Sequence, residues 1–127
     1  LGSKTLDDGD VMILPGGYPG YVNLCNSKQL GVIARKYYES GKILAAICGA
    51  PTVLATNEIA VGKKITCHHS VKDKMEAYEY TGENVVEDGN LITGIGAGRS
   101  LDFSLFIASR LTDDATIEKV KHGLEIP

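Results

Sequence analysis

The stretch Ala45–Ala55, "AAICGAPTVLA", decides how this sequence folds. A run of small apolar residues leads to a single cysteine, Cys48, and a second apolar run follows Pro51. A short apolar run that ends in a Gly-Ala-Pro break is typical of a buried strand. Proline suits the first turn of a helix, because its missing N–H costs nothing there. The stretch therefore predicts a strand, a tight turn at Cys48 and a helix.

The rest of the chain alternates between strand patterns and helix patterns. Strands are expected at Val11–Leu14, at Lys42–Ile47 and over 62–69, with a hairpin over 84–95 that turns at Asp88-Gly89. Helices are expected from Asn26 or Ser27 to about Ser40, over Pro51–Asn57, within 96–111 after a glycine turn, and over about Asp113–Leu124. A loop over 18–27 and a helical turn with a loop over 71–82 complete the pattern. It predicts an α/β sandwich with a largely parallel sheet, whose ligands bind at the carboxyl ends of the strands.

Composition limits the classes of function. The chain has 127 residues, 43% of them hydrophobic and 23% charged, which suits one globular domain over 1–127. A net charge of -3 without a basic cluster argues against nucleic acid or an anionic membrane surface as partner. The longest apolar run, Ile43–Ala55, is too short to cross a bilayer, and no signal peptide is expected. Three cysteines without framework spacing favour reduced thiols and a cytoplasmic location.

Cys48 is the leading candidate for chemistry. A cysteine on a strand-to-helix turn has the geometry of a nucleophile elbow, here written A-x-C-G-A. The positive end of the following helix favours its thiolate form. The N–H of Gly49 is placed to donate to an oxyanion. The alternative is a small buried side chain, since free cysteines are among the most buried residues.

Two further motifs are candidates for the same site. In "PGG", Pro15 to Gly17, paired glycines let backbone N–H groups face a ligand, although a simple tight turn has the same pattern. In "TCHHS", strand alternation puts Cys67 and His69 on one face, and Thr66 and His68 on the other. One histidine then faces Cys48 as a general base, or both lie at the surface. Cys67 and His69 are too few ligands for a metal site, so no metal is expected. Cys25, in the loop, is expected to be a bystander.

The glycine-rich stretch "GIGAGRS" resembles a dinucleotide-binding loop but breaks its pattern. The fingerprint G-x-G-x-x-G needs glycine where this chain has Arg99, and no acidic residue follows at the required distance. No cofactor is therefore expected. A helix-entry turn packed near the elbow is the better interpretation.

Taken together, the motifs resemble a known family. "LPGG", "AAICGAPTVLA", "KKITCHHSVKDKM" and "ENVVEDGNLITGIGAG" occur in the order and at the separations of the ThiJ/PfpI superfamily, with the greatest similarity to the branch of the Parkinson-disease-associated protein deglycase. The resemblance covers nearly the whole chain. It implies a flavodoxin-like three-layer sandwich, usually dimeric.

The resemblance also implies a function and a set of site residues. Cys48 matches the family's nucleophilic, oxidation-sensitive cysteine, His68 its nearby histidine, and the N–H groups of Gly17 and Gly49 its oxyanion pocket. The implied activity is that of a cofactor-independent glyoxalase or deglycase, acting on small reactive 2-oxoaldehydes or glycated proteins in the stress response. Alternatives are an oxidative-stress sensor or chaperone that uses oxidation of Cys48, and an amidase or peptidase of the same superfamily. The peptidase-like branch has histidine directly after the cysteine, where this chain has Gly49.

One member of the family's site has no match. Family members hold the cysteine with a glutamate from a first helix that precedes "LPGG", and nothing in Leu1–Asp10 matches that helix. The resemblance therefore implies that this chain is the C-terminal two-thirds of the domain, without its first strands and helix. Strands Val11–Leu14 and Ile43–Ile47 are apolar along their length, which predicts burial on both faces and an unprotected apolar edge. The expected partners are a missing N-terminal segment, as a separate fragment or chain, and a second copy in a homodimer.

Overall fold

A four-stranded sheet forms the middle layer of the molecule. The structure is a computed structural model that describes residues 8–126. The strands β1 (Val11–Leu14), β2 (Ile43–Ile47), β6 (Leu91–Gly94) and β5 (Val85–Asp88) lie side by side in that order. β1, β2 and β6 are parallel, and β5 pairs antiparallel with β6. The largely parallel sheet and the hairpin are confirmed. Residues 1–7, most of the segment Leu1–Asp10 in which no match to the family's first helix was found, lie outside the described residues.

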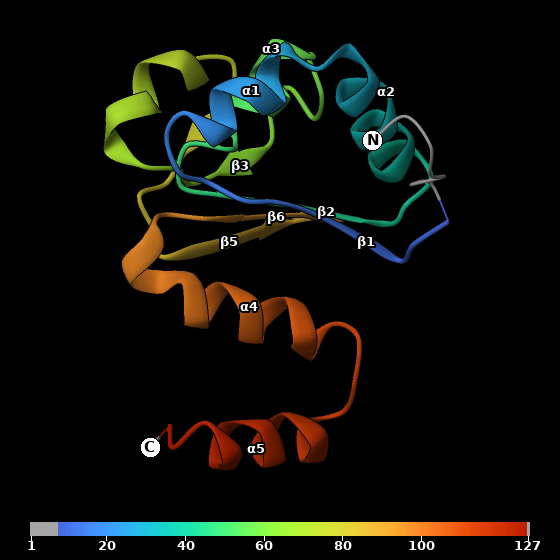
Figure 1. Cartoon of the computed structure of the whole chain (residues 1–127), viewed down its shortest axis with the longest axis vertical. Coiled ribbons are helices and arrows are strands. Elements are labelled where there is room, and N and C mark those ends of the chain that lie inside the picture. Colours follow the sequence, from blue (N-terminus) through green and yellow to red (C-terminus); the bar gives the residue numbers. More distant parts are fainter. Residues whose placement is uncertain (1–7, 127) are drawn as a thin grey trace.

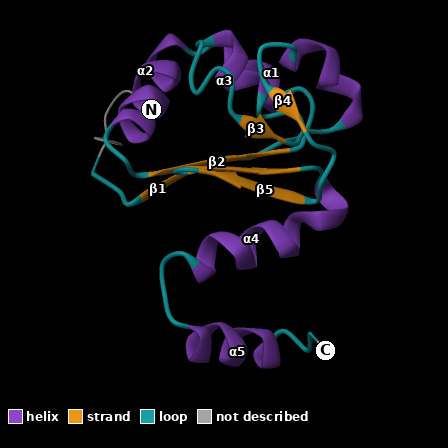
Figure 2. Ribbon diagram, turned by 180° about the vertical axis from the view of Figure 1, so that it is seen from behind, coloured by secondary structure: helices purple, strands orange, loops and turns teal. Residues whose placement is uncertain are grey.

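Helices cover both faces of the sheet (Figure 1). One face carries α1 (Gly20–Asn26), α2 (Lys28–Glu39), α3 (Thr52–Thr56) and the 3₁₀ helix η1 (His69–Met75). The other face carries α4 (Ser100–Ser109), which the short 3₁₀ helix η2 (Ala97–Arg99) precedes. The last helix, α5 (Asp114–Gly123), lies beyond α4, as the view from behind also shows (Figure 2). The three-layer α/β sandwich is confirmed.

Helix starts follow local capping rules. The Ser27 side chain accepts a hydrogen bond from the Leu30 N–H at 3.1 Å and so caps α2. Asp113 caps α5 in the same way, accepting from the Thr116 N–H at 2.7 Å. These bonds satisfy N–H groups that a helix start leaves without a partner, so both predicted starts are correct.

The alternation of side chains along β2 divides the core in two. Leu44 and Ala46 face the layer of α2 and α3, while Ala45 faces α4 together with Ile92. All four side chains are buried. The tight packing on both faces holds the carboxyl end of β2, where Cys48 follows, in a fixed place.

Two segments differ from the prediction because of contacts with distant parts of the chain. The predicted loop over 18–27 contains α1, whose Tyr21, Leu24 and Cys25 pack against the core. The predicted strand over 62–69 is only β3 (Lys64–Ile65), and it pairs with β4 (Glu79–Tyr80) in a separate two-stranded sheet.

Two apolar elements are only partly buried: β1, one of the two strands expected to present an apolar edge, and α4. β1 is the edge of the sheet, and its Ile13 is 51% exposed, although Val11 on the same face packs against the cluster that includes Phe103 and Ile107 of α4. In α4 only Phe103 and Ile107 are buried, while Leu101 stays 47% exposed. An apolar composition on most sides of this helix therefore did not mean burial on most sides. Within residues 8–126, no helix combines the length and apolar character needed to span a bilayer.

Candidate functional site

Cys48 lies on the turn that the sequence predicts, one residue after β2, in a strained conformation. Its φ is +65°, in the left-handed region that costs a residue with a β-carbon about 1–2 kcal/mol. Two backbone hydrogen bonds hold it there. The Cys48 N–H donates to the Gly94 carbonyl at 3.0 Å, and the Cys48 carbonyl accepts from the His68 N–H at 2.8 Å. The end of β6 and the segment after β3 therefore fix the thiol from both sides.

The "PGG" turn brings the end of β1 against Cys48. A β-carbon added to Gly16 would lie 2.7 Å from the Cys48 Cβ and 2.9 Å from the Ile47 carbonyl oxygen, so only glycine allows this approach. Gly17 has φ +94° and open space around it. Among the described residues, the N–H groups of Gly17 and Gly49 donate to no protein acceptor. An oxyanion site requires N–H groups of this kind, and of the two glycines Gly17 is exposed whereas Gly49 is buried.

His68 is held in one tautomer by the start of η1. Its Nδ1 accepts a hydrogen bond from the Ser70 N–H at 3.2 Å and lies 2.7 Å from the Ser70 Oγ. An imidazole nitrogen that accepts from an N–H carries no proton, so the proton of the ring lies on Nε2. His68 therefore presents a donor, rather than a basic nitrogen, from the atom that Ser70 leaves unoccupied.

Two open depressions meet at Cys48. The first, called here the site depression, has a volume of about 560 Å³ and is lined by Cys48, His68, Ile95, Gly96, Ala97, Gly98 and Arg99. The second has a volume of about 350 Å³ and is lined by Gly16, Gly17, Ile47, Cys48, Ala97 and Ser100. Among the described residues, no aspartate or glutamate lines either depression. The carboxylate that the resemblance implies has no counterpart there.

The structure brings three of the four predicted site residues together. Cys48 and His68 share the site depression, and Gly17 lies in the depression on the other side of Cys48. Gly49 follows Cys48 but lines neither, because its Cα faces Tyr21: an added β-carbon would lie 2.6 Å from that ring. The glycine-rich turn packs against the elbow, as predicted from "GIGAGRS".

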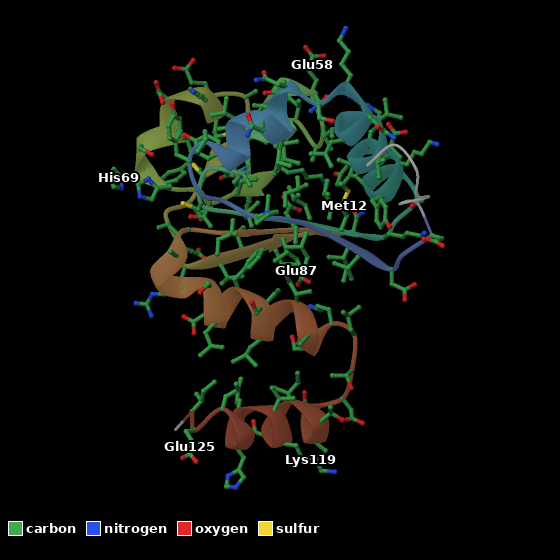
Figure 3. The ribbon with its side chains drawn as sticks, in the orientation of Figure 1. Met12, Glu58, His69, Glu87, Lys119 and Glu125 are labelled. Atoms are coloured by element: carbon green, nitrogen blue, oxygen red, sulfur yellow. The ribbon has the colours of Figure 1, made fainter. Side chains whose placement is uncertain are left out.

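The predicted alternation of the two histidines is wrong. Residues 66–68 follow β3 outside the sheet, and His69 already belongs to η1. Thr66 and Cys67, expected on opposite faces, are both fully buried. His69 stacks on His68 with ring centroids 4.2 Å apart and points outward at the end of the molecule (Figure 3).

Cys67 and His69, which were too few to predict a metal site, also lie apart in the structure. Cys67 is buried in the core, whereas His69 lines a depression on the surface. Within residues 8–126, no three side chains of the histidine, cysteine, aspartate and glutamate types lie close enough together to hold an ion.

The other two cysteines differ from Cys48 in their surroundings. Cys25 is half-buried, with its Sγ 3.3 Å from the Thr52 hydroxyl, which itself donates to the Gly49 carbonyl at 2.6 Å. Burial, and the nearby charge of Cys48, raise the pKa of the Cys67 thiol to about 11, although Lys72 lowers it in part. Cys67 therefore stays a neutral thiol at physiological pH and is a poor nucleophile.

This pKa predicts a loss of stability at alkaline pH. The Cys67 thiol ionises near pH 9.0 when exposed and near 11 in the folded protein, so the unfolded state loses its proton first. The stabilisation is complete below pH 9 and is lost as pH rises through 11, with a slope of at most about 1.4 kcal/mol per pH unit. Urea unfolding across this window is expected to show a steeper decline for the wild type than for Cys67→Ala. Equal slopes would contradict the assignment.

Sequence reasoning missed two contributors to the site. Gly16 was considered only for its backbone N–H and not for its close approach to Cys48, and Arg99 only as the residue that breaks a dinucleotide motif. The signal for Gly16 was its place two residues after a strand, at the sheet edge where Cys48 also lies. No local signal places Arg99 beside Cys48, since η2 reaches the depression only through the packing of the sheet.

Comparisons with known proteins identify the family of this chain. The model of the DJ-1/PfpI family matches residues 3–110. Protein dj-1beta of Drosophila melanogaster is 40% identical over 126 residues, which cover 98% of this chain and 67% of the relative. The glutathione-independent glyoxalase DJR-1.2 of Caenorhabditis elegans is 39% identical over 104 residues, which cover 80% of this chain and 55% of the relative.

A solved structure shows the same fold. The crystal structure of Drosophila melanogaster DJ-1beta superposes with a TM-score of 0.92 at 39% identity, over 95% of this chain and 66% of the fly chain. The present chain thus spans between about half and two-thirds of the length of these relatives. The family model, the relatives and the fold agree, and the chain belongs to the DJ-1 branch of the DJ-1/PfpI family.

Proposed function

We propose that this chain carries the nucleophile of a cofactor-independent glyoxalase or deglycase that acts on reactive 2-oxoaldehydes through Cys48. The observation that carries the proposal is the strained elbow, which exposes the Cys48 thiol to a depression shared with His68. Strain at one residue, held by two backbone bonds, is a feature that proteins retain mainly at functional sites. The name of one relative, a glutathione-independent glyoxalase, supports the same class of reaction.

The proposed reaction begins with addition of the Cys48 thiolate to the aldehyde carbon of a substrate such as methylglyoxal. A bond forms between sulfur and that carbon, and the carbonyl oxygen becomes an alkoxide that takes up a proton to give a hemithioacetal. The N–H groups of Gly17 and Gly49 stabilise the developing negative charge. A proton then moves from the former aldehyde carbon to the neighbouring carbonyl carbon, and the hydroxyl proton passes to the oxygen of that neighbouring carbon, which gives a thioester. Water hydrolyses the thioester to lactate and the free thiol.

His68 takes the role of a hydrogen-bond donor in this scheme. Because Ser70 occupies Nδ1, the Nε2–H of His68 donates to the substrate oxygen rather than removing a proton. We assign the proton transfer between the two carbons to a carboxylate that is not among the described residues lining the two depressions beside Cys48. Lactate formation by the intact protein, without added glutathione, is the test, and the absence of turnover would contradict the proposal.

Redox sensing through the same thiol is the second candidate. Cys48 opens to a depression, whereas Cys67 is buried and stays protonated. Peroxide is then expected to oxidise Cys48 first, to the sulfinate, with the same N–H groups stabilising the product. Peptide mass mapping after a peroxide titration tests this. Oxidation of Cys25 or Cys67 ahead of Cys48 would contradict it. The three cysteines are free, which agrees with a cytoplasmic location as part of the proposal.

The proposal includes a partner for the edge of the sheet. Among the described strands, β1 pairs only with β2, and Ile13 on β1 is 51% exposed. Since the chain covers about half to two-thirds of its relatives, we propose that an N-terminal segment of the same domain adds strands beside β1 and completes the site.

Intact-mass analysis of the purified protein under denaturing conditions checks this prediction. We expect the mass to include the N-terminal segment, either as a companion polypeptide beside this 13.5 kDa chain or within one longer chain. A single 13.5 kDa species with a folded circular-dichroism spectrum would contradict it. Sedimentation then tests whether a second copy, in a homodimer, covers the edge instead.

A further inference from the structure

Among the described residues that line the site depression, Arg99 is the only one with a fixed charge. The other lining groups are the Cys48 thiol, the His68 ring, the side chains of Ile95 and Ala97, and two glycines. A guanidinium stays charged at every physiological pH and matches the planar fork of a carboxylate. The surface around the thiol therefore carries a fixed positive charge that aldehyde chemistry as such does not require.

The ion pair of Arg99 with Asp102 leaves the guanidinium charge available to a ligand. Asp102, in the first turn of α4, lies 3.4 Å from the Arg99 Nη1, and both side chains are 53% exposed. Exposed pairs of this kind contribute little and are screened by salt, so an incoming anion competes with Asp102 for the guanidinium. Asp102 itself lines a different depression, between α4 and α5.

We propose that the site depression selects small electrophiles that carry an anionic group, a carboxylate or a phosphate, and that Arg99 determines this selectivity. This deepens the proposed function by naming its substrate class, and it rests on that function only in taking Cys48 as the reacting thiol. The aldehyde or other electrophilic carbon faces the Cys48 sulfur, and the anionic group faces Arg99. The effect is modest because the depression is open to water, and we expect about a fivefold preference.

Two alkylating reagents measure this selectivity without any turnover. Iodoacetate and iodoacetamide both react when the thiolate displaces iodide and a carbon–sulfur bond forms, but only iodoacetate is anionic. The ratio of their rates at Cys48, followed by mass mapping of the Cys48 peptide, cancels changes in thiol ionisation or exposure. We expect Arg99→Gln to lower the ratio of the iodoacetate rate to the iodoacetamide rate about fivefold. Asp102→Asn is expected to raise it.

A matched control removes one positive charge at a place distant from the site depression. Lys119→Gln changes the net charge equally, but Lys119 lies on α5, far from the end of the molecule that carries His69 (Figure 3). We expect this variant to keep the wild-type ratio. Salt at about 1 M, where the Debye length is about 3 Å, is expected to lower the wild-type ratio toward that of Arg99→Gln.

An unchanged ratio in Arg99→Gln, or an equal fall in Lys119→Gln, would overturn the proposal. If Arg99→Gln fails to fold, Asp102→Asn and the salt dependence of the wild type decide, and no change in either would also overturn it. The readout is separate from the proposed reaction. Lactate formation with an unchanged ratio contradicts this inference alone, while a changed ratio without lactate formation contradicts the proposed function alone.

Discussion

Replacing Cys48 with serine is expected to lower lactate formation from methylglyoxal by roughly a thousandfold or more in the intact protein. A serine hydroxyl is not ionised near neutral pH, so the step that forms the hemithioacetal loses its nucleophile. The backbone need not change, because serine has the same β-carbon at the strained φ of +65°. The measurement is the initial rate of lactate formation without added glutathione, with circular dichroism to show that the variant folds.

Cys25→Ser is the matched control for this variant. The change is chemically identical, and the serine hydroxyl can still bond the Thr52 hydroxyl that lies 3.3 Å from the Cys25 sulfur. We expect this variant to keep its activity within about twofold, since Cys25 lines neither depression beside Cys48. Equal turnover by Cys48→Ser and the wild type would remove Cys48 from the reaction altogether.

Gly16→Ala is expected to lower the free energy of unfolding by about 2 kcal/mol and to slow alkylation of Cys48. The added β-carbon would lie 2.9 Å from the Ile47 carbonyl oxygen, a backbone atom that cannot rotate away, and 2.7 Å from the Cys48 Cβ. Relief requires that the ends of β1 and β2 move apart, which disturbs the elbow. Urea unfolding and the rate of iodoacetamide labelling at Cys48 measure the two effects.

Gly20→Ala separates this clash from a general effect of replacing glycine. Gly20 starts α1, and an added β-carbon there meets no atom within 4 Å. We expect Gly20→Ala to leave both the stability and the labelling rate of Cys48 near their wild-type values. A Gly16→Ala protein as stable as Gly20→Ala would show that the turn adapts and that the close approach is not required.

Local patterns were enough to predict the main sheet and the elbow. The apolar run of β2, the break at Cys48 and the helix signal at Pro51 are adjacent in the chain, so short-range sterics and hydrogen bonds specify them. The same holds for the caps at Ser27 and Asp113, where one side chain satisfies an N–H three residues on. The hairpin turn at Gly89, with φ +63°, is local as well.

Other features depend on contacts between residues far apart in the chain, and no local pattern encodes them. α1 forms where Tyr21 packs against Gly49, although its own sequence reads as a turn. The strand order, and not composition, decides that β1 rather than β2 lies at the edge of the sheet, where Ile13 is exposed. Arg99 stands beside Cys48 only because β6 pairs with β2 and directs the glycine turn across the elbow. Pairing partners and their register are set by the packing of the whole core, and the charge next to the thiol follows from that packing.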